Sequence, residues 1–135
     1  MNSTAIEPAI NFSLDLSNGI PIYRQIIQQI DYAILSGRMQ PGDRLPTIRS
    51  LAMELRTNPN TIARAYGELE ILGILETQVG RGTYVSDKKP VQEDESLNRK
   101  IREVLTRFLQ DMRDLGVGKR ELAALIAAEE ERMNV

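Results

Sequence analysis

The chain of 135 residues contains no cysteine and no histidine. The lack of cysteine excludes disulfides and thiol chemistry, and the lack of both residues excludes zinc fingers and histidine-based metal sites. Histidine is also the commonest general base. The sequence offers no phosphate-cradling glycine loop and no pair of carboxylates in a recognisable catalytic frame. We therefore expect no enzymatic activity, no metal and no cofactor.

Long apolar runs are also absent, since none approaches the roughly 20 residues that a membrane-spanning helix needs. The first 11 residues lack the basic and then apolar pattern of a secretory signal. A hydrophobic share of 41% and a charged share of 27% are typical of a globular protein. We expect a cytoplasmic protein without a membrane partner, built from one domain and a small appendage.

The chain has no overall excess of positive charge, because its formal net charge is −2. The distribution is uneven, however. Residues 38–64 contain five arginines and two acidic residues, whereas residues 90–135 contain eight basic and ten acidic residues. Small local imbalances are common, so this one matters only beside other signals.

The segment 57–70 reads as a short helix with a clear start. Asn58 is a good N-cap because its side chain can accept a hydrogen bond from a free backbone N–H, and Pro59 suits the first helical position. Later residues are spaced to pack inward; they are Ile62, Ala65, Tyr66, Leu69 and Leu72. The first turn presents hydrogen-bonding side chains that can reach bases and phosphates, namely Asn60, Thr61 and Arg64.

A second short helix is predicted over residues 48–55, with Thr47 placed to cap it. Its inward residues are expected to be Ile48, Leu51, Ala52 and Leu55. Only Arg56 to Asn58 separate it from the next helix, and so tight a connection is typical of a helix-turn-helix. We therefore expect the helix that begins after Asn58 to be a DNA recognition helix.

The N-terminal part is expected to hold a loose arm over residues 1–11 and a short strand. Phe12, Leu14 and Leu16 alternate with polar residues, which is the pattern of a strand, and Asn18-Gly19 follows as a turn. Residues 21–36 then show a helical apolar period that ends before Gly37.

After Gly73 the pattern changes to that of a β-hairpin, with strands over residues 74–79 and 83–86. Gly80-Arg81-Gly82 forms the turn between them. A hairpin directly after a helix-turn-helix is the wing of a winged helix. A third strand beside it is expected either near Phe12 or at Arg44-Leu45. The winged helix-turn-helix domain thus covers residues 12–86.

Residues 87–96 are charged and aperiodic and are interpreted as a linker, and residues 97–135 as two helices separated by Gly116-Val117-Gly118. A free 45-residue hairpin rarely buries an adequate core. Its apolar face must pack either on the winged domain or, as we favour, on a second subunit. The expected dimerisation residues are Leu97, Ile101, Val104, Leu105, Phe108, Leu109, Met112, Leu115, Leu122, Leu125 and Ile126. The fold class is α+β: an N-terminal winged helix-turn-helix with a short C-terminal two-helix dimerisation segment.

Over residues 12–86 the chain resembles the GntR family of bacterial transcription regulators, and within it the YtrA subfamily. The matching motifs are Pro21 to Ile26, Pro41 to Ala52, Asn58 to Thr61, Ala65-Tyr66, Glu68 to Glu70 and Gly80 to Val85, in order and at the family's spacing. The short two-helix tail also fits this subfamily, whose members lack the larger ligand-binding domains of other GntR proteins.

The resemblance implies DNA-contacting roles where residues match. Arg49 matches an arginine of the second helix that contacts DNA in related regulators, and the glycine-flanked Arg81 matches the wing tip that approaches the minor groove. Many relatives carry arginines where this chain has Pro59 and Ala63, so those contacts are not implied here. The expected DNA-binding residues are Arg49, Asn58, Asn60, Thr61, Arg64, Gly80, Arg81 and Gly82, with Arg38 and Arg44 as candidates for the flanking backbone.

Each of these residues also has a purely structural interpretation. Asn58 can be a helix cap and nothing more, and Gly80 and Gly82 can be needed only for the geometry of the hairpin. The arginines can be solvent-exposed charges that contact no partner. Our expectation is a homodimeric regulator, acting as a repressor, that binds an inverted-repeat operator in double-stranded DNA. An effector is unknown. The alternative is a winged helix used for protein docking or RNA binding.

Overall fold

The computed structural model describes residues 10–87 and 93–133 and divides the chain between Glu93 and Asp94 into two compact units. The first unit holds helices α1 (Ile22–Leu35), α2 (Ile48–Leu55) and α3 (Pro59–Ile71) and strands β1 (Leu75–Gln78) and β2 (Gly82–Val85). The second unit is made of α4 (Glu93–Asp114) and α5 (Lys119–Arg132). This is the α+β winged helix-turn-helix with two C-terminal helices that the sequence predicted.

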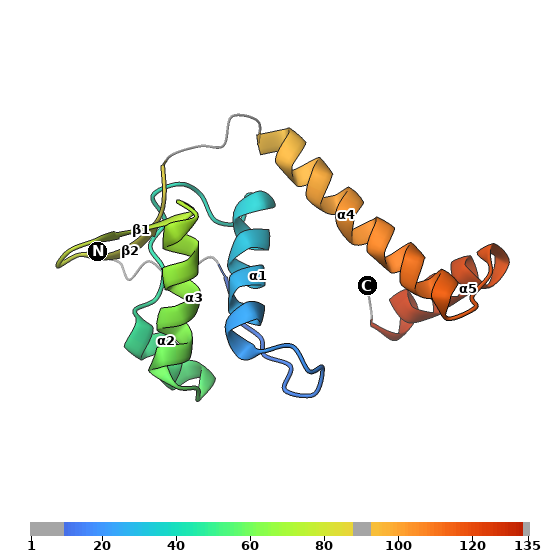
Figure 1. The fold of residues 1–135 in the computed structure, drawn as a ribbon, viewed down its shortest axis with the longest axis horizontal. Helices are drawn as coiled ribbons and strands as arrows, with labels where there is room; N and C mark the ends of the chain where they lie inside the picture. The colour runs from blue at the N-terminus through green and yellow to red at the C-terminus, as the bar shows by residue number, and fades with distance from the viewer. Residues whose placement is uncertain (1–9, 88–92, 134–135) are drawn as a thin grey trace. The chain divides into compact units, whose positions relative to one another are not determined.

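The core of the first unit lies where α1 and α3 run side by side, with α2 packed on α3 (Figure 1). Its fully buried apolar side chains come from all three helices and from the loops and strands around them; they include Ile26, Ile30, Met39, Leu45, Leu51, Ile62, Leu69 and Leu75. Burial of this apolar surface is the main term that stabilises the unit. It also fixes α3 on the scaffold with one face turned outward.

The strand predicted over Phe12 to Leu16 is not formed. Instead, side-chain amides of α1 bind this extended segment: the Gln29 amide pairs with the N–H and C=O of Ser13 at 2.9 and 2.6 Å. The Gln25 amide pairs with the N–H and C=O of Asp15, both at 2.9 Å. The alternating pattern correctly predicted an extended backbone at Phe12 to Leu16. However, its hydrogen-bond partners are glutamine side chains rather than a neighbouring strand.

Ile10, assigned to the arm by the sequence, is buried in the core, and residues 1–9 lie outside the described residues. Two other burial expectations were wrong. Ile48 is 37% exposed at the start of α2, and Leu72 is 69% exposed because α3 ends at Ile71 and Leu72 is its C-cap. Beyond the end of a helix, its period no longer determines which way a side chain points.

Replacing Gln25 by leucine is expected to lower the free energy of unfolding by about 2 kcal/mol, because it removes the partner of three backbone groups. Besides its two bonds to Asp15, the buried Gln25 amide donates to the carbonyl of Ile20 at 2.8 Å. Urea denaturation followed by circular dichroism measures the change. Gln28→Leu, on an exposed position of the same helix, is the control and should change stability by less than about 0.5 kcal/mol. Equal losses would contradict the role given to Gln25.

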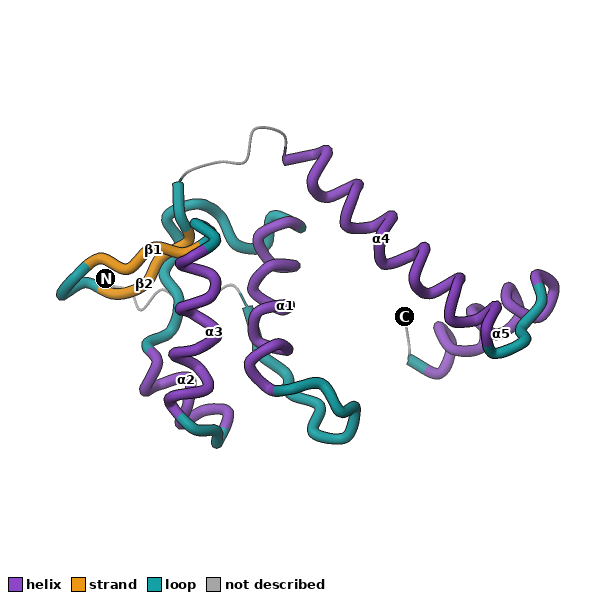
Figure 2. Tube along the Cα trace, viewed as in Figure 1, coloured by secondary structure: helices purple, strands orange, loops and turns teal. Residues whose placement is uncertain are grey.

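The wing is the antiparallel pair β1 and β2, in register from Leu75 opposite Val85 to Gln78 opposite Gly82 (Figure 2). Arg44 forms a bridge with Tyr84, and the N–H of Leu45 donates to the carbonyl of Thr83 at 2.8 Å. The third strand position is thus the one at Arg44-Leu45 and not the one near Phe12. This bridge attaches the wing to the loop that leads into α2.

The second unit has the two predicted helices, separated by the predicted break at Gly116-Val117-Gly118. α4 begins at Glu93, four residues before its apolar face starts at Leu97, so part of the segment interpreted as a linker is helical. Residues 88–92 lie outside the described residues. Among residues 96–133 no side chain is buried. Within the described part of the chain, no helix is long and apolar enough to cross a membrane.

Candidate nucleic-acid interface

The first turn of α3 is exposed and held by a defined cap. The Asn58 side chain accepts a hydrogen bond from the N–H of Asn60 at 2.8 Å, and Pro59 occupies the first helical turn. Asn60 and Arg64 are exposed and Thr61 is half-buried. The structural role predicted for Asn58 is confirmed by this bond. The side chains that remain presented on this turn are those of Asn60, Thr61 and Arg64.

Arg49 belongs to α2, which is the first helix of the helix-turn-helix, and α3 is the second. Thr47 caps α2 by accepting from the N–H of Ser50 at 3.0 Å, and Arg49 is exposed in the first turn that follows. α2 ends at Leu55, and its C-cap Arg56 has a left-handed φ of 53°. Nothing in the sequence marks this conformation, because glycine or asparagine is the usual residue there. Arg56 is exposed, and sequence reasoning did not single it out.

The wing tip presents Arg81 between two glycines with positive φ, 77° at Gly80 and 131° at Gly82. The N–H of Arg81 donates to the carbonyl of Gln78 at 2.8 Å, which closes the turn. A β-carbon at position 82 would lie 3.0 Å from Nε of Arg44. The backbone conformation therefore favours glycine at position 82, and a β-carbon there would also displace the Arg44 side chain slightly. The hairpin role predicted for both glycines is confirmed.

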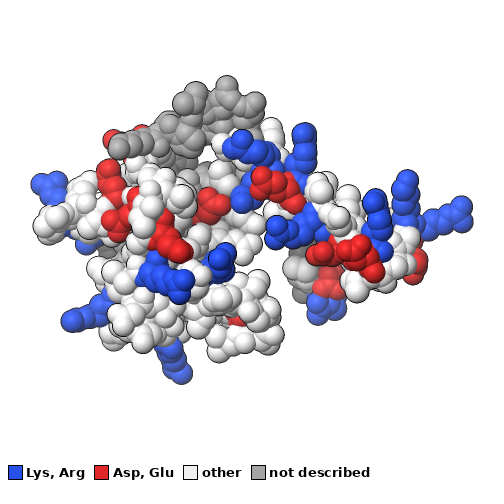
Figure 3. Space-filling view, in the orientation of Figure 1, with Lys and Arg blue, Asp and Glu red and all other residues white. Residues whose placement is uncertain are grey.

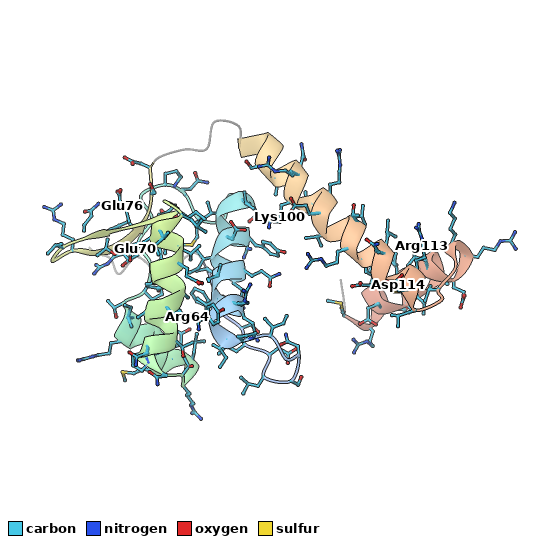
Figure 4. The ribbon with its side chains drawn as sticks, viewed as in Figure 1. Arg64, Glu70, Glu76, Lys100, Arg113 and Asp114 are labelled. Atoms are coloured by element: carbon cyan, nitrogen blue, oxygen red, sulfur yellow. The ribbon has the colours of Figure 1, made fainter. Side chains whose placement is uncertain are left out.

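The Arg64 guanidinium of α3 stacks on the ring of Tyr23 on α1, with 3.7 Å between its central carbon and the ring centroid. Figure 4 shows Arg64 between these two helices. The guanidinium of Arg24 lies 5.7 Å from the same centroid. Sequence reasoning missed both α1 residues, since no local pattern relates residue 23 to residue 64.

Arg38 is placed away from the start of α1. It follows the C-terminal end of α1, where its Nε donates to the Ser36 hydroxyl at 3.0 Å, whereas Tyr23 lies at the N-terminal end. A helix of this length spans about 20 Å. Arg38 therefore does not lie beside the first turns of α3.

Positive side chains of the first unit project at the wing tip and at the end where α2 meets α3, and acidic side chains lie between them (Figure 3). On the second unit both signs are mixed along α4. The positive groups thus lie where the helix-turn-helix and the wing present polar side chains. Cationic side chains in such positions can neutralise phosphates of a nucleic acid.

Comparisons with known proteins agree with this geometry. The family model described as bacterial regulatory proteins, gntR family, matches residues 22–85. The chain is 44% identical to the HTH-type transcriptional regulator YhcF of Bacillus subtilis over 102 residues, which cover 76% of this chain and 84% of YhcF. It is 44% identical to the HTH-type transcriptional repressor YtrA of Bacillus subtilis over 104 residues, covering 77% of this chain and 80% of YtrA. The chain belongs to the GntR family.

A solved structure of a GntR family transcriptional regulator from Listeria monocytogenes shares the fold, with a TM-score of 0.64 and 36% sequence identity. The match covers 84% of this chain and 98% of the Listeria chain. Together with the similarity to YtrA over most of both chains, this places the protein in the YtrA subfamily. It is a DNA-binding transcriptional regulator of the GntR type.

In this GntR domain, Tyr66 ties α3 to the segment that enters α2. Its side chain is 1% exposed, and its hydroxyl donates to the carbonyl of Pro46 at 2.7 Å. Burial raises the pKa of the Tyr66 phenol, so the hydroxyl stays protonated and keeps donating at high pH. Sequence reasoning placed Tyr66 among the inward-packing residues of this helix, and the structure confirms this.

Tyr66→Phe is expected to lower the free energy of unfolding by about 1 kcal/mol at neutral pH. Above about pH 10 the unfolded tyrosine ionises while the folded phenol stays protonated. The unfolded state then binds fewer protons, so the wild type loses stability as pH rises and its advantage over Tyr66→Phe shrinks. Urea denaturation between pH 7 and 11 measures this difference. Tyr84→Phe, which loses only an exposed bond to the Arg81 carbonyl, should keep the wild-type alkaline decline.

Proposed function

We propose that this GntR-family protein is a homodimeric repressor that binds an inverted-repeat operator. The α3 helices of two subunits would enter successive major grooves, and the C-terminal helices would join the subunits. The B. subtilis relative YtrA is named as a repressor, which supports the sign of regulation. The protein would act on DNA in the cytoplasm.

The observation that carries the dimer is the uncovered apolar face of α4 and α5. Ile101, Val104 and Leu105 are 54%, 49% and 53% exposed, and Phe108 and Leu109 of the same helix are 37% and 39% exposed. Exposed apolar faces of this kind mark sites of association. The face continues into the loop and α5 through Leu115, Leu125 and Ile126, which are 78%, 47% and 41% exposed. The partly exposed Leu97, Met112 and Leu122 complete the predicted set.

A second copy of the chain suits this face better than a small ligand, because a twofold dimer also provides the two recognition helices that an inverted repeat requires. For each half-site we propose base or phosphate contacts from Arg49, Asn60, Thr61 and Arg64, and minor-groove or phosphate contacts from the wing tip at Gly80, Arg81 and Gly82. Arg44, bound against the wing, and Asn58, at the start of α3, flank these groups. Arg38 is left out because it follows the other end of α1.

Regulation would follow from the same arrangement. Two winged helix-turn-helix domains joined through their C-terminal helices bind both half-sites only when the distance between the domains matches the distance between the half-sites. A signal molecule or a partner that changes this spacing would therefore change operator affinity.

Selection of bound sequences from a pool of random duplex DNA tests the proposal. The expected product is an inverted repeat whose half-sites lie about one helical turn apart, centre to centre. Titration of the best duplex with KCl should give a steep fall in affinity, because phosphate contacts release counterions. A single asymmetric half-site, or a monomer at micromolar concentration in sedimentation velocity, would refute the dimer.

A further inference from the structure

The stack of Arg64 on Tyr23 joins a residue of the recognition helix to a neighbouring helix. Its distance of 3.7 Å between the guanidinium carbon and the ring centroid is well within the range of a cation–π interaction. Tyr23 is half-buried and packs against the core, whereas Arg64 is exposed. The ring is therefore the fixed partner, and the guanidinium is the group whose position the stack restricts.

The hydrogen-bonding capacity of Arg64 remains available. The ring occupies a face of the planar guanidinium, while the N–H donors lie in its plane. Among the described residues no carboxylate forms an ion pair with Arg64. The Arg24 guanidinium, 5.7 Å from the same ring centroid, adds a second positive charge. Two cations near one ring favour an anion as their common ligand.

We infer that Tyr23 is a positioning residue that holds the Arg64 guanidinium ready for a phosphate of the operator backbone. The inference rests on the proposed function, because it assumes that α3 enters the major groove. Because Tyr23 belongs to α1, the stack holds Arg64 on the side of α3 that faces α1, and we take this side as the rim of the surface that α3 would present to DNA. Phosphates line the rim of the groove and bases lie at its floor, so a side chain held at the rim meets the backbone.

This arrangement also explains why an aromatic residue on α1 matters for a contact made from α3. A free arginine side chain loses much rotamer freedom when it binds a phosphate. Stacking on Tyr23 restricts that freedom before DNA arrives, so less is lost on binding. The ring face is sufficient for this purpose, and the Tyr23 hydroxyl is not required.

The experiment compares the full-length wild type with Tyr23→Leu, Tyr23→Phe, Arg64→Ala and the Tyr23→Leu/Arg64→Ala double variant. Fluorescence anisotropy measures binding to the duplex selected above and to a scrambled duplex of the same length, over a series of KCl concentrations. Tyr32→Leu, which removes another half-buried tyrosine from α1, is the matched control. All titrations are run below the melting temperature of each variant.

Tyr23→Leu should weaken binding to both duplexes about tenfold, from a loss of roughly three- to fivefold at each of two half-sites. Arg64→Ala should weaken both duplexes and lower the salt slope by about one counterion per half-site. The double variant should bind no more weakly than Arg64→Ala alone, because Tyr23 acts through Arg64. Tyr23→Phe and Tyr32→Leu should keep wild-type affinity and salt slope.

Additive losses in the double variant, or a Tyr23→Phe variant as weak as Tyr23→Leu, would overturn the inference while leaving the proposed function intact. A loss confined to the selected duplex would replace the phosphate contact by a base contact and also overturn it. In these titrations the proposed function fails if the wild type shows no preference for the selected duplex. A further measurement needs no DNA: the Arg64 Nε–H resonance should carry a ring-current shift that Tyr23→Leu abolishes, and its absence from the wild type would refute the stack.

Discussion

Phe108→Asp is expected to convert the proposed homodimer into a monomer and to weaken binding to the selected inverted repeat by about 100-fold or more, because a monomer loses the effective concentration that links the two half-sites. Phe108 lies within the exposed apolar face of α4 and is itself 37% exposed. In a dimer, aspartate at this position would place an unpaired carboxylate in an apolar interface, which is strongly unfavourable.

The matched control is Gln110→Asp, which introduces the same charge on the same helix at another exposed position. Residues two apart lie on different sides of a helix, so this variant should stay dimeric and keep its operator affinity. Sedimentation velocity reports the oligomeric state and anisotropy reports the affinity for the duplex. If Phe108→Asp remained dimeric, α4 would not be the interface. If it were monomeric with unchanged affinity, the two-site model of recognition would be wrong.

Arg49→Ala is expected to weaken binding to the selected duplex by roughly tenfold per half-site and about 100-fold for the symmetric dimer, since a bidentate arginine contact contributes about 1–3 kcal/mol. Arg49 is exposed in the first turn of α2, and no ion pair with it occurs among the described residues. The guanidinium is therefore available to DNA. A phosphate contact would weaken the selected and scrambled duplexes equally, and a base contact would weaken only the selected one.

Asn60→Ala provides the contrast. Its exposed amide can read a base edge but carries no charge, so the variant should lose preference for the selected duplex and keep its salt slope. Arg120→Ala in α5 removes one positive charge outside the winged domain and serves as the control for net charge. If Arg120→Ala weakened binding as much as Arg49→Ala, the effect would be one of overall charge. If neither Arg49→Ala nor Asn60→Ala changed binding, the alternative of protein docking or RNA binding would gain.

Much of this molecule was predictable because its signals are local. The caps at Thr47 and Asn58 lie within three residues of the N–H groups that they accept from. The apolar period of α2 gave its bounds, since a helix must turn one face to its partner. The glycines at the wing tip indicated the turn because they tolerate positive φ.

The errors arose where the partner of a residue is distant or where an element ends. The alternation at Phe12 to Leu16 could not show that Gln25 and Gln29 of α1, 10 and 16 residues from their partners along the chain, would supply the hydrogen bonds of a strand. Leu72 followed the helical period one residue beyond the end of α3. In the first case the local pattern predicted an extended backbone correctly but did not identify its hydrogen-bond partners. In the second case the helical spacing continued, but the helix did not.

The sequence by itself determined the order of elements, the caps that begin α2 and α3, the hairpin and the apolar face of the tail, because each depends on residues a few positions apart. Only the tertiary structure decided that Arg64 rests on Tyr23, that Arg44 lies against Gly82, and that the first half of α3 lies beside the start of α1 rather than beside the end that Arg38 follows. These relations join residues 38 to 41 positions apart in the first two cases. They depend on how α1, α3 and the wing pack around one core, and such packing is a property of the folded chain rather than of any local pattern.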